Sequence, residues 1–261
     1  MRILAVSKWF SRRALLAALI FGPSFSWAIE SELGYEFWDI SFFTPSRIWR
    51  LAMKEREETT ANYAEYIRTS RFGRVDNTFV LGYIGKEPSW AWELKAGVTP
   101  KADVMYRQMG ELILYMPTPG IKIEPMFRGN YRRYTGAKVM TSELGLRWTP
   151  APGWDATGRW GRIQTALLDE TGSKNSSPSS YYQVGYLWSD LLRVFAYQSS
   201  LEEFFDPGNP DNPSAYSLTE RGGGFWWTLD QGLRLMGSYG LEQRSNNTSI
   251  KKFGITFQQT Y

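Results

Sequence analysis

The sequence of 261 residues contains neither cysteine nor histidine. Without cysteine the chain can form no disulfide, no thiolate zinc site and no cysteine nucleophile. Without histidine it lacks the Ser-His-Asp triad, the commonest general acid or base and the imidazole ligands of metal sites. Carboxylate, lysine, tyrosine or serine chemistry stays open, but no motif indicates it. We therefore predict a protein that is not an enzyme and that holds no cofactor and no metal.

A hydrophobic run long enough to cross a membrane as a helix is also lacking. The apolar run Ala14–Phe21 is much shorter than the roughly 20 residues that a spanning helix needs, and charges interrupt the runs after residue 28. Basic residues precede this run, and the small residues Ser26 and Ala28 follow it. This order predicts a signal peptide over residues 1–28, cleaved before Ile29, with an uncleaved anchor as the alternative.

The mature chain also has no excess of positive charge, because the excess lies in the leader. The whole chain has 30 Lys and Arg against 26 Asp and Glu, and four of the basic residues lie in the leader: Arg2, Lys8, Arg12 and Arg13. The mature chain, residues 29–261, is therefore neutral. This balance argues against nucleic acid as a partner, because such binding depends on a basic surface.

What the mature chain does have is alternation with a period of two. From Ser89 to Val98, for example, polar or small residues alternate with Trp90, Trp92 and Leu94. Tryptophan and tyrosine gather near the ends of such segments, while charges and glycine share the opposite face. Apolar residues toward lipid, aromatic girdles and a polar lumen are typical of a transmembrane β-barrel. We predict an all-β, antiparallel transmembrane barrel, with a soluble periplasmic β-sandwich as the alternative fold.

The turn residues divide this barrel into about 14 strands, or 12 if the second and third merge or are lost, because Glu57-Glu58 between them contains no turn former. Short periplasmic turns are predicted at Pro117–Gly120, Pro150–Gly153, Ser189–Asp190 and Asp230–Gly232, and longer external loops at Thr171–Pro178 and Asp206–Pro213. The predicted strands are 33–42, 46–56, 59–69, 76–85, 89–98, 104–116, 121–133, 137–148, 154–168, 180–189, 191–203, 215–228, 232–243 and 248–261.

The last predicted strand carries a separate signal. Phe253, Ile255, Phe257 and the terminal Tyr261 share one face, and Gln259 is the one departure from the apolar pattern. Outer-membrane barrels commonly end in such a strand. We therefore predict that these four residues are recognised by the barrel-assembly machinery.

The order of several short segments resembles the YaiO-like outer-membrane β-barrel family, over nearly all of the mature chain. These segments are Gly34–Asp39, Arg71–Asp76, Gly97–Asp103, Tyr131–Tyr134 and Ser142–Leu146, followed by the aromatic C-terminus. Met105 departs from the pattern, where an aromatic residue is expected. The resemblance implies an outer-membrane barrel, sometimes associated with surface-polysaccharide systems, and it brings no catalytic residue.

Alternation places a mixed set of charges on the predicted lumen face. This set can line an open pore and select solutes, or form a salt-bridge ladder that plugs the lumen. Its members are Glu93, Lys95, Glu143, Arg147, Arg159, Arg234, Glu242 and Arg244.

We expect an integral protein of the Gram-negative outer membrane, surrounded by lipid and lipopolysaccharide. Its leading predicted function is a non-enzymatic pore or conduit linked to surface-polysaccharide or exopolysaccharide export, with export components as partners. One alternative is a plugged structural barrel that binds partners through residues 171–178 and 206–213. The other is a lipid-modifying enzyme.

Overall fold

The computed structural model describes residues 28–41, 43–117, 122–168, 174–203, 216–230 and 232–261. In these ranges no helix is long and apolar enough to cross a membrane. The described chain is built from fourteen strands: β1 (Ala28–Ile40), β2 (Ser46–Arg56), β3 (Thr60–Arg71), β4 (Arg74–Lys86), β5 (Ala91–Val98), β6 (Gln108–Tyr115), β7 (Ile123–Arg133), β8 (Ala137–Trp148), β9 (Trp154–Leu167), β10 (Lys174–Ser189), β11 (Leu192–Glu203), β12 (Tyr216–Asp230), β13 (Leu233–Arg244) and β14 (Ser249–Thr260).

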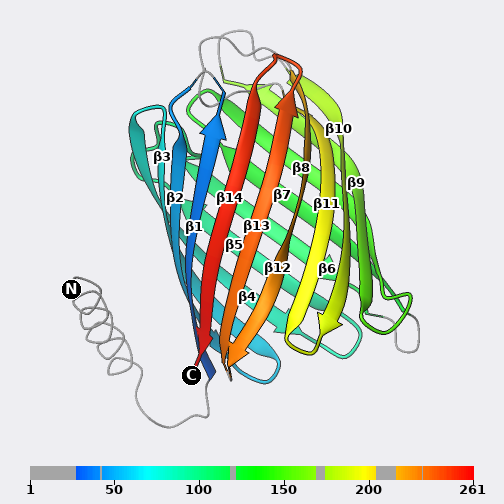
Figure 1. Ribbon diagram of the computed structural model, residues 1–261. Coiled ribbons are helices and arrows are strands. Elements are labelled where there is room, and N and C mark those ends of the chain that lie inside the picture. Colours follow the sequence, from blue (N-terminus) through cyan, green and yellow to red (C-terminus); the bar gives the residue numbers. More distant parts are fainter. Residues whose placement is uncertain (1–27, 42, 118–121, 169–173, 204–215, 231) are drawn as a thin grey trace, which may run out of the picture.

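These strands form one closed antiparallel sheet in which each strand pairs with its sequence neighbours (Figure 1). The first and last strands close the barrel, with Glu30 opposite Thr260 at one end of their ladder and Ile40 opposite Ile250 at the other. Closure leaves no sheet edge with unpaired backbone groups. The predicted all-β barrel is confirmed, and it has fourteen strands rather than twelve.

The connection between β2 and β3 shows why these strands stay separate without a glycine or proline. The Glu57 amide donates a hydrogen bond to the Thr60 carbonyl at 2.9 Å. The Thr60 hydroxyl donates in turn to the Glu57 carboxylate, also at 2.9 Å. The side chain of Glu57 therefore helps to close this turn. It takes the role that a glycine or proline plays in most tight turns.

The barrel has two unlike ends. At the end where β1 begins and β14 finishes, which we call the turn end, the connections include residues 57–59, 190–191 and 231–232. At the opposite end, the loop end, the described connections include 72–73, 99–107, 134–136 and 245–248. The predicted short turns Pro150–Gly153 and Ser189–Asp190 lie at the turn end, whereas residues 118–120 and 231 of the other two lie outside the described residues. The β3–β4 connection at the loop end is also short, and Phe72 and Gly73 both have positive φ there (53° and 75°), as tight hairpins require.

Several predicted boundaries differ from the structure, two of them at loops. Lys174–Pro178, predicted as part of an external loop, belong to β10 and pair with Arg162–Ala166 of β9. The proline is tolerated because pairing with β11 begins only at Ser179, so the ladder is one-sided at Pro178. The strand predicted at 104–116 begins only at Gln108, because residues 99–107 fold as a loop.

Other predictions lie wholly or partly outside the described residues. The loop 206–213 lies wholly outside them, as do residues 171–173 of the other predicted loop. The leader also lies outside them, apart from Ala28, which is the first residue of β1 and lies opposite Arg56. The first strand therefore starts five residues before the predicted Leu33.

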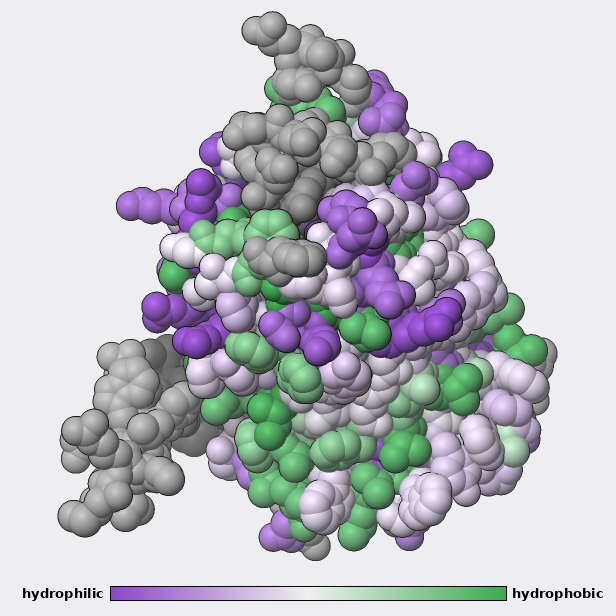
Figure 2. All heavy atoms as spheres, turned by 45° about the horizontal axis from the view of Figure 1, so that its top comes forward, coloured by the Kyte–Doolittle hydropathy of each residue, from purple (hydrophilic) through white to green (hydrophobic). Residues whose placement is uncertain are grey.

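The outer surface of the barrel is apolar toward the turn end. Leu81 and Leu144 are each 68% exposed and Trp188 is 72% exposed, although large hydrophobic side chains normally avoid water. Figure 2 shows hydrophobic residues gathered on the lower part of the visible face and hydrophilic residues toward the loop end. This outer surface suits a lipid bilayer, and the polar groups of the strands turn inward.

The number of strands sets the width of the interior. A wall of fourteen strands, spaced about 4.8 Å apart and tilted by about 40°, encloses a backbone-to-backbone diameter of roughly 28 Å. An eight-stranded barrel is filled by its own side chains, whereas barrels of sixteen or more strands leave an aqueous channel. A barrel of fourteen strands lies between these two cases, so the lumen is the first candidate for a functional site.

Candidate functional site

The charged face of the strands points into the barrel. Lys252 on β14 contacts Glu220 on β12 although β13 lies between them, and Arg193 on β11 contacts Asp155 on β9 across β10. Side chains converge over an intervening strand on the concave side of a curved sheet. The strand register then assigns the remaining inward residues, because residues directly opposite each other share a face.

One group of charges occupies the middle of the wall formed by β5 to β8. The Lys95 ammonium lies 3.0 Å from the carboxylate of Glu93 and 3.1 Å from that of Glu111. The Arg128 guanidinium contacts Glu111 at 2.6 Å and Glu143 at 3.3 Å. Each cation thus contacts two carboxylates, and Glu111 on β6 is shared between Lys95 on β5 and Arg128 on β7.

This first group continues on both sides. The Tyr63 hydroxyl on β3 donates to Glu93 at 2.9 Å, reaching across β4. On the other side the Arg159 guanidinium lies 3.6 Å from Glu143 and also 4.1 Å from the centre of the Tyr181 ring. The contacts therefore extend from β3 to β10.

A second group lies on the opposite wall, on β12 to β14. The Lys252 ammonium is 2.6 Å from Glu220 and 2.7 Å from Glu242. The Arg244 guanidinium contacts Glu242 at 2.5 Å. Lys252 also lies 4.7 Å from the centre of the Trp38 ring on β1, a cation–π contact that connects this group to the closing seam of the barrel.

Two tyrosines join the groups into one belt around the lumen. The Tyr181 and Tyr197 rings are 6.2 Å apart and nearly parallel, at 20°. The Tyr197 hydroxyl donates to Glu220 at 2.6 Å. We call the connected inward residues from Tyr63 to Lys252 and Trp38 the lumen belt. Each contact within the belt joins residues on the same strand, on adjacent strands or on strands separated by one other strand.

The lumen belt does not cross the barrel. β7, which carries Arg128, and β14, which carries Lys252, are seven strands apart in a ring of fourteen and so face each other across the lumen. Within the described ranges, no ion pair joins these opposite walls, because each described pair runs along the wall. The ion pairs of the belt therefore follow the wall and do not bridge the facing walls of the described barrel.

The structure places all eight predicted lumen residues on the inward face, but it brings only six of them into the lumen belt. Glu93, Lys95, Glu143 and Arg159 belong to the first group, and Glu242 and Arg244 to the second. Arg147 lies closer to the turn end, half exposed, with its guanidinium 3.7 Å from Glu124. Arg234 also lies near the turn end, opposite Gln258.

Sequence reasoning missed four charged members of the belt, Glu111, Arg128, Glu220 and Lys252, and it did not assign the aromatic members to the lumen. In β6 and β7 the inward face also carries buried apolar residues, Ile113 and Met126, which weakens the alternation. In β14 the prediction concerned only the outward aromatic residues, so the inward Lys252 was not assigned to the lumen. Counting inward charges strand by strand from the C-terminus would have revealed it.

The four residues of the C-terminal signal all lie on the outward face. Phe253, Ile255, Phe257 and Tyr261 are between 41% and 76% exposed. Phe253 packs against Tyr239 of β13, with the ring centres 5.1 Å apart. Their recognition by the assembly machinery stays a prediction.

Residues 99–107, between β5 and β6, fold against the inner wall at the loop end. The Asp76 carboxylate on β4 is completely buried and accepts hydrogen bonds from the amides of Asp103, Val104 and Met105, at 3.0, 2.8 and 2.6 Å. Next to them, the Thr78 and Thr99 hydroxyls are 2.7 Å apart. This anchor fixes the loop to the inward face of β4 and narrows the mouth of the lumen.

Tyr106 is the innermost aromatic residue of this loop. It is 7% exposed and lies between the Arg132 guanidinium, at 5.9 Å, and the Tyr134 ring, at 6.5 Å. Burial of the hydroxyl raises the pKa of Tyr106 to about 12, while the nearby Arg132 acts in the opposite direction. The side chain is therefore an uncharged hydrogen-bonding group at neutral pH.

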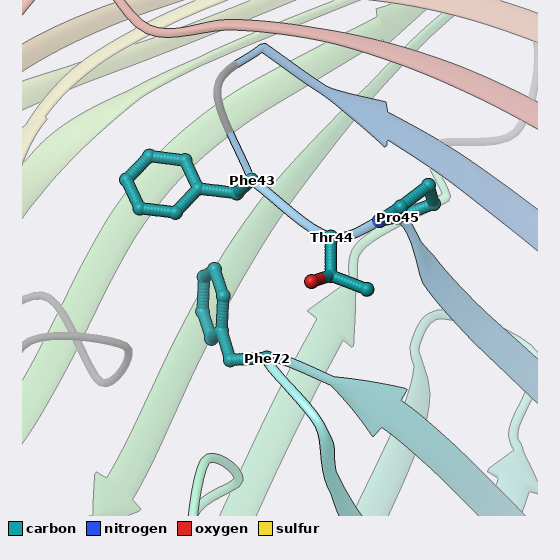
Figure 3. Close-up of a pocket in the computed structure, with 4 residues that line it drawn as sticks. All are labelled: Phe43, Thr44, Pro45 and Phe72. Atoms are coloured by element: carbon teal, nitrogen blue, oxygen red, sulfur yellow. The ribbon is translucent and has the colours of Figure 1, made fainter.

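A shallow depression at the loop-end rim is lined by Phe43, Thr44, Pro45 and Phe72 (Figure 3). The Phe43 and Phe72 rings meet edge to face at 5.7 Å. The Arg71 guanidinium lies 4.7 Å from Phe72 and 5.6 Å from Trp38, which connects the rim to the lumen belt. The depression is shallow and open, and it is lined by few polar groups, so the lumen is the main candidate site.

Neither a family model nor a curated protein matches the sequence. Solved structures do match. The structure titled "CymD monoaromatic hydrocarbon channel" is 9% identical, with 90% of this chain and 88% of that chain covered and a TM-score of 0.58. Outer-membrane expressed OmpT of Vibrio cholerae is 9% identical over 92% and 99% of the two chains, with a TM-score of 0.55. The anion-selective porin from Comamonas acidovorans is 6% identical over 90% and 99%, with a TM-score of 0.52.

These similarities define the class of the fold. The chain is a fourteen-stranded β-barrel of the outer-membrane type, and it shares its architecture with channels and porins. Sequence identities of 6% to 9% support a shared fold but not a shared function. The solutes named for those proteins are therefore not assigned to this chain.

Proposed function

We propose that this protein is a passive, non-enzymatic pore in the outer membrane of a Gram-negative bacterium. The observation that carries the proposal is the course of the lumen belt, whose ion pairs follow the wall from β5 to β14 and leave the axis of the barrel free of described contacts. A salt-bridge ladder that plugged the lumen would join facing walls, such as β7 and β14.

The charge pattern of the belt favours uncharged hydrophilic solutes. Lys95, Arg128 and Lys252 each contact two carboxylates, so cations and anions nearly cancel over short distances. A balanced lining creates little net field for selecting ions, in contrast to a ring of one sign. It still offers many hydrogen-bond donors and acceptors to a polar solute.

Saccharides are the solute class that we propose within this group. The nearly parallel rings of Tyr181 and Tyr197 present aromatic surface beside the Glu220 carboxylate, and sugars use both kinds of contact. The resemblance to the YaiO-like family adds support for a role in surface-polysaccharide export. Export components and the barrel-assembly machinery are the proposed protein partners.

The proposal is tested by planar-bilayer recording of refolded residues 29–261. We expect step-like conductance with weak selectivity between cations and anions. Liposome swelling with neutral sugars of increasing length would then measure the size limit. Refolded barrels that insert but never conduct would disprove the open pore.

A plugged barrel is the second candidate, and one observation favours it. Residues 99–107 are fixed inside the loop end by the buried Asp76. If this loop closed the lumen, wild-type protein would be silent and removal of its anchor would produce conductance. The same recordings therefore separate the two candidates.

A further inference from the structure

The outward face of β7, β8, β9 and β10 carries four cations and, among its described residues, no acidic group. Arg133, Lys138, Arg162 and Lys174 are all exposed, and all lie toward the loop end of their strands. We call these four residues the basic patch. Their exposure on the outer surface separates them from the lumen belt, where each cation has a carboxylate partner.

Three members of the basic patch lie in one row across the strands. Arg133 is directly opposite Lys138, Lys138 is opposite Ala166, and Ala166 is opposite Lys174. Directly opposed like charges destabilise a sheet unless something neutralises them. The small Ala166 between the two lysines leaves a gap roughly two strand spacings wide, about 10 Å between their backbones. The row therefore presents cations on both sides of a gap in which an anion could bind.

The described residues do not supply that anion. No ion pair is found between the basic patch and the rest of the described chain. The inner wall behind the patch has its own balanced contacts, such as Arg159 with Glu143. Among the residues that the structure describes, the patch is therefore a set of outward cations without a carboxylate partner.

An apolar surface lies directly beside the cations, toward the turn end. Met140 is 50% exposed, Leu144 68% and Val184 47%, all on the outward face of β8 and β10. Met140 is two residues from Lys138, about 7 Å along the strand. A ligand that fits this arrangement has phosphate groups at one level and several acyl chains immediately below them.

The position of the basic patch also selects one leaflet. At the turn end of the same strands the outward strand residues include Trp148, Trp154 and Trp188, which form an aromatic girdle, and none of them is a cation. The phosphate-binding surface is thus confined to the end opposite the short turns. That end faces outward in the orientation predicted from the loops.

We propose that the basic patch binds the phosphate groups of lipopolysaccharide in the outer leaflet, with the acyl chains on Met140, Leu144 and Val184. This inference rests on the proposed membrane location but not on conductance. Bound lipid phosphates would remove the repulsion between Arg133 and Lys138. They would also fix the tilt and depth of this side of the barrel.

The test compares two variants that each lose four outward cations at the loop end. The patch variant is Arg133→Gln, Lys138→Gln, Arg162→Gln and Lys174→Gln. The control variant is Arg47→Gln, Arg68→Gln, Arg221→Gln and Lys251→Gln, which are exposed outward positions on β2, β3, β12 and β14. Heat-modifiable migration on gels shows that each variant is folded.

Binding is measured by native mass spectrometry with hexa-acyl lipid A carrying two phosphates and with the same lipid after removal of the phosphates. We expect the patch variant to bind the phosphorylated lipid at least about tenfold more weakly than wild type, and the control variant to bind nearly as well. Wild type should lose a similar factor with the dephosphorylated lipid.

Equal losses in both variants would show unspecific charge attraction and overturn the proposal. Undiminished binding of the dephosphorylated lipid, or competition by millimolar inorganic phosphate beyond the effect of chloride at equal ionic strength, would also overturn it. Conductance in phospholipid bilayers without lipopolysaccharide is the separate readout for the pore. Loss of conductance alone rejects the pore, and loss of binding specificity alone rejects the lipid site.

Discussion

Lys252 on β14 reaches past β13 and places its ammonium 2.6 Å from a carboxylate oxygen of Glu220 on β12. The same ammonium contacts Glu242 at 2.7 Å and covers the Trp38 ring at 4.7 Å. One side chain thus ties together β12, β13, β14 and β1, where the two ends of the sheet meet. Lys252 is therefore both part of the lumen lining and a clamp on the seam of the barrel.

Replacement of this lysine, Lys252→Met, should reduce the free energy of unfolding by about 1–3 kcal/mol, because Glu220 and Glu242 each lose a cation and keep, among the described residues, only Tyr197 and Arg244 as partners. It should also make the pore more cation-selective, because the wall gains net negative charge. Urea unfolding in lipid vesicles measures the first effect, and the reversal potential in a salt gradient measures the second.

The matched control is Lys251→Met, which removes a lysine from the next position on the exposed outer face. It should change neither quantity by much. Adding Glu220→Gln to Lys252→Met should bring back part of the lost stability and selectivity. If both lysine variants behaved alike, the contacts of Lys252 would have no special importance.

The anchor of loop 99–107 gives a second prediction. Asp76→Ala leaves three amides without their acceptor, at Asp103, Val104 and Met105, so the loop should detach from the inner wall. We expect larger or noisier single-channel currents and faster protease cleavage within the loop. Asp103→Asn, which changes an exposed carboxylate in the same loop, is the control, and equal currents in all three proteins would contradict the anchoring role.

Most of the fold could be predicted from the sequence because a barrel strand exposes its two faces to different solvents. This contrast produced a clear alternation in β5, β8 and β13, whose boundaries agree with the predicted ones to within two residues. It failed at residues 104–107, where Val104 and Tyr106 are buried by a loop instead of a strand. Alternation cannot distinguish these cases, because burial inside the barrel mouth also favours apolar residues.

The candidate site was harder to predict than the fold. Alternation assigned Glu93 and Lys95 to the lumen, but it could not indicate that Lys95 also contacts Glu111 on the neighbouring strand. Such contacts depend on the register between strands, and a shift of two residues preserves the faces while changing the partners. The course of the ion pairs along the wall therefore required the structure.

A glycine in β4 provides a third prediction. The Tyr63 ring lies directly over Gly82, so closely that a Cβ there would overlap the ring atoms. Gly82→Ala should displace the ring, break the hydrogen bond from its hydroxyl to Glu93 and cost about 1 kcal/mol of stability. In a Tyr63→Ala background the same glycine replacement should cost almost nothing. A double-mutant cycle of unfolding free energies measures this coupling, and strictly additive effects would rule it out.

The C-terminal strand gives the last prediction, which concerns assembly. Phe257 and Tyr261 are exposed on the outer face, at 45% and 76%, although the pairing of β14 with β1 and β13 relies on backbone hydrogen bonds. If the assembly machinery recognises this outward face, Phe257→Ala with Tyr261→Ala should lower the amount of barrel in the outer membrane severalfold. The same variant should still refold in detergent, because little native packing is lost. Gln259→Ala on the same face is the control, and membrane fractionation with heat-modifiable migration is the measurement. A variant that refolds poorly in detergent would instead assign these aromatic residues to the stability of the barrel itself.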